Sequence, residues 1–229
     1  LEDKAGRGDV VLLAQNETGY VNLSQLLSKV LLSSDAASTP ACAFEDLAGY
    51  NEGLILLTGG ALTGFVGKPA GDGRANLAQQ RLESLAAILP SRIYVELQRH
   101  GLPVELAGEP HILECAFRMN LPLVATNDCR FEDPSMSQPH DTLVCIGTGR
   151  KISEQERLRY SSEHYFKKSF QMVELFKDIP EAIENTLVIA KRCSVMAETR
   201  APILPAFATS AGRDEAAEVR AQAQSGLQA

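Results

Sequence analysis

Short apolar runs alternate with longer helical patterns along the chain, and this alternation restricts the possible folds more than any other feature. The apolar runs occupy residues 10–13, 54–60, 93–98 and 121–126. Amphipathic stretches lie between them, and turn residues such as Pro90 end the segments. Short strands separated by helices are typical of βα units and a largely parallel sheet. We therefore predict an α/β fold whose strand carboxyl ends share one face.

Helical patterns continue after the last strand. Helices are expected at residues 19–33, 44–48, 75–89, 104–120, from 163 with Ser161 or Ser162 as the cap, at 181–193 and at 214–229. The apolar residues of 137–147 are also compatible with a short helix. Leu1–Asp9 has the composition of a charged loop, and 202–207 that of a linker. These patterns predict strand-bearing βα units at 1–150, a helical end at 151–200, and a linker with the start of another region at 201–229.

Composition excludes several classes of protein. With 22 basic and 29 acidic residues the net charge is -7, so this chain has no broad basic surface for nucleic acid. Its five widely spaced cysteines include no CxxC pair, which argues against a disulfide framework or structural zinc and favours a reducing compartment. Without a bilayer-length apolar run or a signal peptide, we expect a cytoplasmic protein with no membrane contact. The non-methionine start and the abrupt final helix indicate a piece of a longer chain.

The segment Leu121–Phe131, LPLVATNDCRF, carries the first candidate site because a buried strand ends there in polar residues. Asp128 lies where a metal ligand or a phosphate-positioning group is expected in a parallel α/β fold. The alternative is that Thr126, Asn127 and Asp128 only satisfy backbone groups at a turn. Arg130 cannot ligate a metal, because a guanidinium has no free lone pair. It is expected either to pair with Asp128 or to lie exposed in solvent.

Other residues near the strand ends are weaker candidates. His140 is expected in a loop near these ends and is the one histidine considered for the site, whereas His111 and His164 are expected on helix surfaces. Gly59 and Gly60 follow a strand, but their context matches neither GxGxxG nor a P-loop, so a tight turn is the better explanation. Covalent catalysis is unsupported, because no serine or cysteine has a nucleophile-elbow context.

Several longer motifs resemble one known family. The motifs LLAQNETGYVNLSQLLSKV, NEGLILLTGG, RIYVELQRHG, LPLVATNDCRF, YFKKSFQMVELFKDIPEAIENTLVIAKRC and ILPAF occur in this order. Together they resemble the alpha (catalytic) subunits of bacterial DNA polymerase III, in the later part of the N-terminal PHP (polymerase and histidinol phosphatase) domain. The resemblance covers Val10 to Phe207. It implies an incomplete, distorted (β/α)7 PHP-type barrel followed by a helical segment that leads to the polymerase thumb and palm.

The resemblance also implies a set of metal ligands that is largely missing here. Asp9 stands where the family has a histidine, Gly60 where it has a cysteine, and Arg130 where it has another histidine. The family aspartate is present as Asp128. If any residue here binds a metal, we expect it to be Asp128, with His140 as a possible neighbour of that site. The family's first HxH motif would precede Leu1. Such losses predict that the metal cluster and its 3′ to 5′ exonuclease activity are gone.

The leading hypothesis is a degenerate PHP scaffold within a replicative DNA-directed DNA polymerase, with no catalytic residue and no cofactor in this part. The resemblance implies Mg²⁺ for the parent polymerase, DNA contact through that parent, and docking of the proofreading exonuclease and other holoenzyme subunits. The alternative is a metal-dependent phosphoesterase with Asp9, Asp128 and His140 as ligands, or an active 3′ to 5′ exonuclease. A third interpretation, a clamp-loader or exonuclease docking module, overlaps with the first.

Overall fold

The computed structural model describes residues 1–34, 39–196, 199, 201, 202, 207, 209, 212 and 214–228. Its strands are β1 Glu2–Asp3, β2 Gly6–Arg7, β3 Val11–Ala14, β4 Leu54–Leu57, β5 Ile93–Leu97 and β6 Leu123–Ala125. Its helices are α1 Glu17–Ser33, α2 Phe44–Gly49, α3 Gly67–Gly71, α4 Ala75–Ile88, α5 Pro103–Arg118, the 3-10 helix η1 Pro134–Met136, α6 Ser137–Thr148, α7 Ser169–Leu175, α8 Pro180–Arg192 and α9 Glu215–Gln228.

The chain forms two compact units, Leu1–Val195 and Met196–Ala229. The first contains both sheets and the candidate site, and the second contains α9. The predicted linker at 202–207 lies, except for its two end residues, outside the described part of the chain. No helix in that described part has the length and apolar character needed to cross a lipid bilayer.

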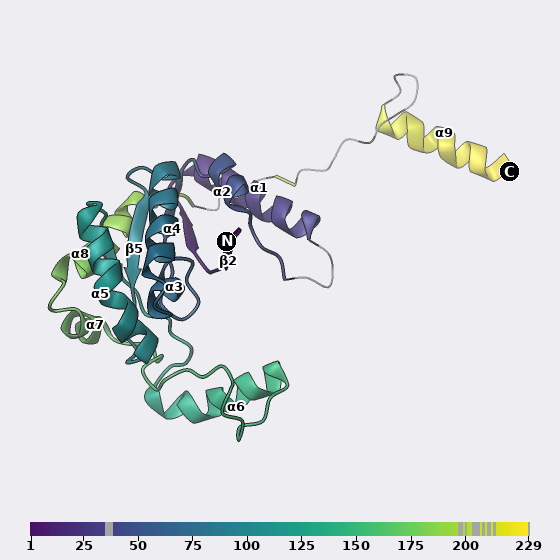
Figure 1. The fold of residues 1–229 in the computed structure, drawn as a ribbon. Helices are drawn as coiled ribbons and strands as arrows, with labels where there is room; N and C mark the ends of the chain where they lie inside the picture. The colour runs from purple at the N-terminus through teal and green to yellow at the C-terminus, as the bar shows by residue number, and fades with distance from the viewer. Residues whose placement is uncertain are drawn as a thin grey trace. The chain divides into compact units, whose positions relative to one another are not determined.

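A four-stranded sheet in the order β3-β4-β5-β6 forms the centre of the first unit (Figure 1). The pairs β4–β5 and β5–β6 are parallel, whereas β3 runs antiparallel to β4 with Val11 opposite Leu57. The predicted α/β class with a largely parallel sheet is confirmed, but the prediction that the strand carboxyl ends share one face is wrong for β3. Because β3 is reversed, its amino end lies at the same edge as the carboxyl ends of β4, β5 and β6.

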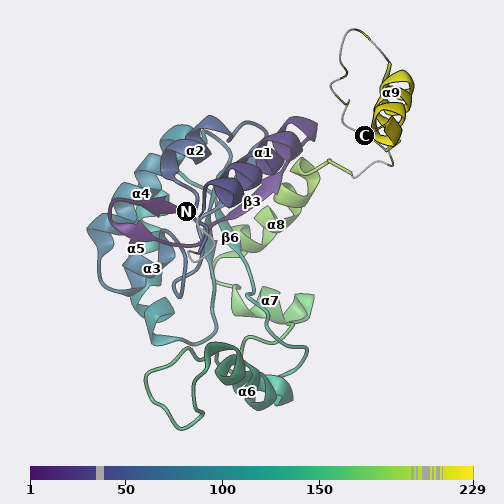
Figure 2. The ribbon, with the colours of Figure 1, turned by 90° about the vertical axis from the view of Figure 1, so that its right-hand side faces the viewer.

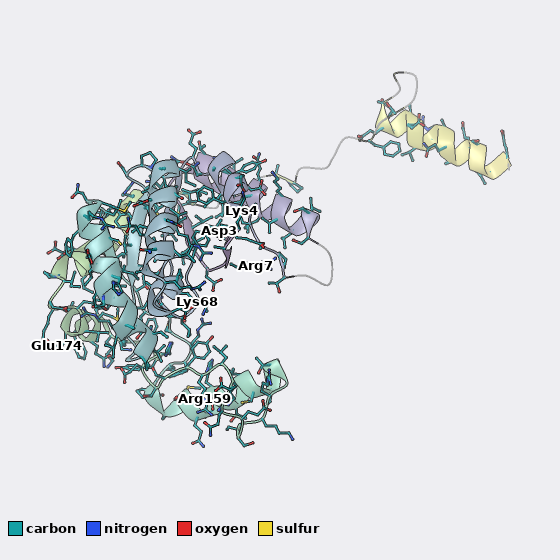
Figure 3. All side chains as sticks on the ribbon, in the orientation of Figure 1. Asp3, Lys4, Arg7, Lys68, Arg159 and Glu174 are labelled. Atoms are coloured by element: carbon teal, nitrogen blue, oxygen red, sulfur yellow. The ribbon has the colours of Figure 1, made fainter. Side chains whose placement is uncertain are left out.

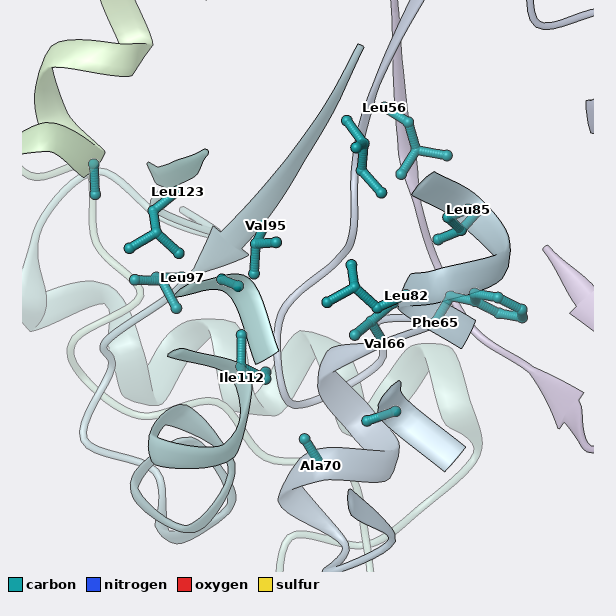
Figure 4. Packing of buried hydrophobic residues seen from close by; sticks show 14 of the residues in the cluster. Leu56, Phe65, Val66, Ala70, Leu82, Leu85, Val95, Leu97, Ile112 and Leu123 are labelled. Atoms are coloured by element: carbon teal, nitrogen blue, oxygen red, sulfur yellow. The ribbon is translucent and has the colours of Figure 1, made fainter. Parts of the chain in front are cut away.

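Side chains of the parallel strands alternate between two apolar clusters. Leu56, Val95 and Leu123 join a cluster with residues of α4 and α5 (Figure 4). On the opposite face Tyr94 packs with Ile189 of α8, and Figure 2 shows α8 and α5 on different sides of β6. Coverage of both faces explains why these strands are apolar at successive positions.

The N-terminal segment differs from the predicted loop, because β1 and β2 form a short antiparallel hairpin. Its Asp3 (labelled in Figure 3) receives two hydrogen bonds from the buried guanidinium of Arg81, at 2.7 and 2.8 Å. Arg81 also donates to the carbonyl of Phe65 and lies 4.1 Å above the Phe65 ring. The hydrogen bond from Arg81 is the main reason that the pKa of Asp3 lies below its usual value. A long-range ion pair therefore orders a segment with weak local preference.

The helix predicted to start at Glu163 is also absent, since α7 begins only at Ser169. Phe131 and Tyr165 instead form a parallel β-bridge. The backbone N–H of Phe166 donates to the carbonyl of Phe131 at 2.9 Å. Extended pairing with the segment after β6 thus uses backbone groups that a helix would need.

Candidate functional site

Four loops meet at one edge of the main sheet. Asp9 precedes β3, while Gly60, His100 and Asp128 are each the third residue after β4, β5 and β6. Asp9 is fixed there by its backbone N–H, which donates to the carbonyl of Thr63 at 2.8 Å. The structure thus brings the predicted positions Asp9, Gly60 and Asp128 to a common edge and adds His100. The shared spacing is measured from the observed strand ends, so it became visible only in the structure.

The two glycines after β4 are enclosed by neighbouring atoms. Gly59 has a φ of +80°, and a Cβ there would lie 2.4 Å from the carbonyl oxygen of Asp9. A Cβ on Gly60 would lie 1.9 Å from Oε1 of Gln98. The glycines therefore serve the tight turn expected from the sequence. A cysteine at Gly60, the residue type that the family resemblance implies, fits only if the Gln98 side chain moves.

Glu96 is a buried carboxylate that the sequence analysis missed. Its side chain accepts hydrogen bonds from the backbone N–H of Gly59 at 3.0 Å and from Nε2 of Gln98 at 2.9 Å. The hydroxyl of Thr126 donates to it as well. These bonds link the ends of β4, β5 and β6, so the Glu96 carboxylate is occupied by protein donors. An acidic residue inside the apolar run IYVELQ was the available signal.

Asp128 and Arg130 form an ion pair, with 2.8 Å between Arg130 Nη2 and Asp128 Oδ2. The guanidinium carbon also lies 4.8 Å from the ring centroid of Tyr160. Burial lowers the pKa of Arg130, but the hydrogen bond and the charge of Asp128 outweigh this, so its pKa lies above the usual value. The predicted pairing is confirmed. Both side chains remain partly exposed, at 29% and 39% for Asp128 and Arg130.

His100 and His164 form a buried stack beside the site, with 3.9 Å between ring centroids and 13° between planes. His100 Nδ1 lies 2.7 Å from Oε1 of Glu105, and Nε2 lies 3.2 Å from Oδ1 of Asn127. Burial and the neighbouring His100 lower the pKa of His164 to about 4. The expectation that His164 lies on a helix surface is wrong, because it is 1% exposed.

The residues around this stack connect separate parts of the chain. The Ser161 hydroxyl, predicted to cap a helix, donates instead to the carbonyl of His100 at 2.7 Å. Asn127 Nδ2 donates to the carbonyl of Tyr165 at 2.8 Å. Asn127 therefore satisfies a distant backbone carbonyl and a ring nitrogen. Thr126 and Asp128 bond to the side chains of Glu96 and Arg130, so the turn interpretation does not account for all three residues. Unlike the buried His100 and His164, His111 is exposed on α5, as predicted.

His140 lies in α6 rather than in a loop. Its ring centroid is 5.3 Å from that of Phe131 and 5.5 Å from that of Tyr160. Tyr160 in turn is 5.1 Å from His164. His140 thus joins an aromatic cluster that attaches α6 to the site edge.

The side chains at this edge do not fit the metal cluster that the family resemblance implies. Among the residues that the structure describes, no three His, Cys, Asp or Glu side chains form a group that could hold a metal ion. Glu96 and Glu105 are occupied by buried donors, and Asp128 by Arg130. The edge is instead a hydrogen-bonded network with one ion pair at its surface.

Comparison with known proteins shows what the chain is similar to. Residues 2–100 match the PHP domain family. The chain is 45% identical to the DNA polymerase III subunit alpha of Caulobacter vibrioides over 95% of its length and 19% of the relative. The corresponding protein of Rickettsia bellii is 38% identical over 96% of the chain and 18% of the relative. That of Escherichia coli is 39% identical over 87% of the chain and 17% of the relative.

The chain thus spans about a fifth of the length of these relatives, and the similarity extends well beyond the part matched by the PHP domain. The sheet edge described above lies within this similar span. The chain is therefore similar, over nearly its whole length, to a segment of bacterial DNA polymerase III alpha subunits, and residues 2–100 of it match the PHP domain family.

Proposed function

We propose that this chain is a segment of a replicative DNA polymerase III alpha subunit and that its PHP part is a non-catalytic scaffold. The parent protein would synthesise DNA in the cytoplasm with Mg²⁺ in a polymerase site outside this segment. The PHP part would dock the proofreading exonuclease subunit. In this proposal its strands belong to an incomplete, distorted (β/α)7 barrel.

The Asp128–Arg130 ion pair is the observation that carries the proposal. A guanidinium 2.8 Å from the surviving carboxylate supplies the positive charge that a metal would otherwise provide. Gly60 offers no ligand, and the space beside it is filled by Gln98. Arg130 and Gly60 each stand where the family resemblance implies a metal-ligating side chain. Together these two replacements favour a scaffold over a hydrolase.

This proposal is tested by metal analysis and a nuclease assay on the full-length protein from which the proofreading subunit has been removed. We expect substoichiometric zinc and manganese, no 3′ to 5′ exonuclease turnover, and normal primer extension. Stoichiometric metal together with exonuclease turnover would overturn the scaffold role. Loss of that turnover in Asp128→Ala but not in Asp133→Ala would assign the activity to this edge.

The phosphoesterase alternative makes a different prediction. It requires Asp9, Asp128 and His140 to act on one ion, yet His140 packs against Phe131 and Tyr160. Hydrolysis of a phosphomonoester that disappears in Asp128→Ala would support it. We expect no such hydrolysis, with Asp133→Ala as the matched acidic control on the surface.

A further inference from the structure

A groove of about 660 Å³ lies on the surface of the first unit, between the start of α5 and the segment around α7. This volume is within the range of sites that bind ligands. The acidic residues that line the groove are Glu105, Glu109, Glu163, Glu174 and Asp178. The basic residues that line it are Arg99 and Lys177. Carboxylates therefore outnumber cationic groups in the groove.

The positive charge of Arg99 is shared between two of these carboxylates. Its Nη2 lies 2.6 Å from Oε1 of Glu109, and its Nη1 lies 2.6 Å from Oδ1 of Asp178. The guanidinium carbon also lies 4.7 Å from the ring centroid of Phe176. Hydrogen bonding to Asp178 and Glu109 raises the pKa of Arg99 above its usual value. One cation therefore serves two anions, which leaves this part of the groove with excess negative charge.

Two carboxylates at the rim of the groove are open to solvent. Glu174, labelled in Figure 3, is 72% exposed and lies 2.6 Å from Nζ of the equally exposed Lys177. Glu163 is 50% exposed, and its Oε2 lies 3.5 Å from Nζ of Lys167, which is longer than a direct hydrogen bond between charged groups. Exposed pairs of this kind are weak, so both carboxylates can accept a second cation.

The groove also has an apolar wall. Leu106 of α5 is 73% exposed there, and Leu175 lies partly buried at the end of α7. An inorganic cation would use the carboxylates alone and leave Leu106 uncovered. A nucleic acid or an acidic peptide would meet charge of its own sign. An exposed leucine among carboxylates thus matches a ligand that presents aliphatic and cationic side chains together.

We propose that this groove binds a peptide segment of another protein in which an aliphatic residue is flanked by lysine or arginine. The aliphatic side chain packs on Leu106, and the cationic side chains pair with Glu163 and Glu174. A cleft lined by one sign of charge attracts the opposite charge from a distance. This inference goes beyond the proposed function and does not depend on it, because residues of this chain alone form the groove.

Fluorescence anisotropy of the labelled hexapeptide KLKKLK with the full-length protein tests the role of charge. Glu163→Gln combined with Glu174→Gln should weaken binding about tenfold. The control Glu132→Gln with Glu156→Gln, two exposed acidic positions outside the groove, should leave binding unchanged. Equal effects of the two double variants would overturn the proposal. So would equal binding of the acidic peptide ELEELE, or no binding of KLKKLK at about 1 mM.

The same assay tests the apolar wall. Leu106→Ser should weaken KLKKLK binding about tenfold, because the aliphatic side chain of the peptide loses its contact. Leu187→Ser, at a similarly exposed position on α8, should have no effect. If Leu106→Ser has no effect while spermidine displaces the peptide, the groove is a site for small cations and the proposal is overturned.

Photocrosslinking locates the bound peptide. A benzophenone group on KLKKLK should attach to residues within 99–109 or 163–178 of the full-length protein, as read by peptide mass spectrometry. Attachment only elsewhere would overturn the proposal. Primer extension by the same preparation reports separately on the proposed function, so failure of one inference is distinguishable from failure of the other.

Discussion

Two acid–base pairs lie three residues beyond neighbouring strands, but their surroundings differ. The His100–Glu105 pair after β5 is buried, and the Glu105 carboxylate also accepts the backbone N–H groups of His100 and Leu102. The Asp128–Arg130 pair after β6 is partly exposed and has one hydrogen bond between its members. The buried pair therefore joins several segments, whereas the exposed pair joins two neighbours in sequence.

This difference separates residues under strong structural constraint from residues under weak structural constraint. Burial raises the pKa of Glu105, but its hydrogen bonds from His100 and Leu102 outweigh that effect and leave the pKa below its usual value. Removing a buried charged partner is costly, because the remaining group stays buried and unpaired. An exposed pair can change at little cost. Asp128 and Arg130 are thus expected to be easier to replace than the buried residues packed beside them.

The largest effect is expected for Glu105→Ala. Loss of this carboxylate leaves Nδ1 of the buried His100 ring and two backbone N–H groups without their partner, which should lower the free energy of unfolding by about 3 kcal/mol. Urea denaturation measures the change. Glu114→Ala, at an exposed position on the same helix, should change stability by less than about 0.5 kcal/mol. Equal effects of the two variants would show that the buried pair has no special structural role.

Acid should weaken the buried region through His164. Its pKa falls from 6.5 to about 4 on folding, so protonation favours the unfolded state and stability is lost as pH falls below 6.5. Between pH 7 and pH 4 the loss from this residue should be on the order of 2–3 kcal/mol. His164→Phe should remove that component, whereas His111→Phe at the surface should retain it. Parallel pH profiles for both variants would contradict this prediction.

A smaller effect is expected at Gly60. In Gly60→Ala the new Cβ displaces Gln98 and weakens its bond to Glu96, at a cost of about 1–2 kcal/mol. Gly147→Ala, in α6 with open space around its Cβ, should be neutral or slightly stabilising. Thermal unfolding measures both. In a Gln98→Ala background the penalty at Gly60 should largely disappear, and an unchanged penalty would exclude the Gln98 contact as its cause.

The smallest effect is expected for the exposed pair. Arg130→Ala combined with Asp128→Ala should lower stability by at most about 1 kcal/mol. Nucleotide incorporation by the full-length protein should change even less, because we place polymerisation outside this segment. Arg150→Ala, which breaks another exposed pair, is the matched control. A collapse of primer extension with an unchanged melting temperature would contradict the scaffold role.

Local sequence patterns predicted most of the elements. The helix at 75–89 and the strand at 93–98 were expected within one residue of the observed α4 and β5. The candidate turn at Asp128 and its pairing with Arg130 were also predicted, because the two residues are close in sequence. Glu96 was missed because two of its three partners, Gly59 and Thr126, are each at least 30 residues away.

The sequence by itself determined the order of strands and helices, the polar strand ends and the family resemblance, since periodicity and motifs are local properties of the chain. Only the tertiary structure decided the reversed direction of β3, the extended conformation around His164 and the burial of that residue. Those features depend on backbone pairing between segments that are distant in sequence, and on the burial of side chains where such segments pack together. Phe131 and Tyr165 form their bridge across such a separation, and that pairing overrides the local helical preference after Ser161.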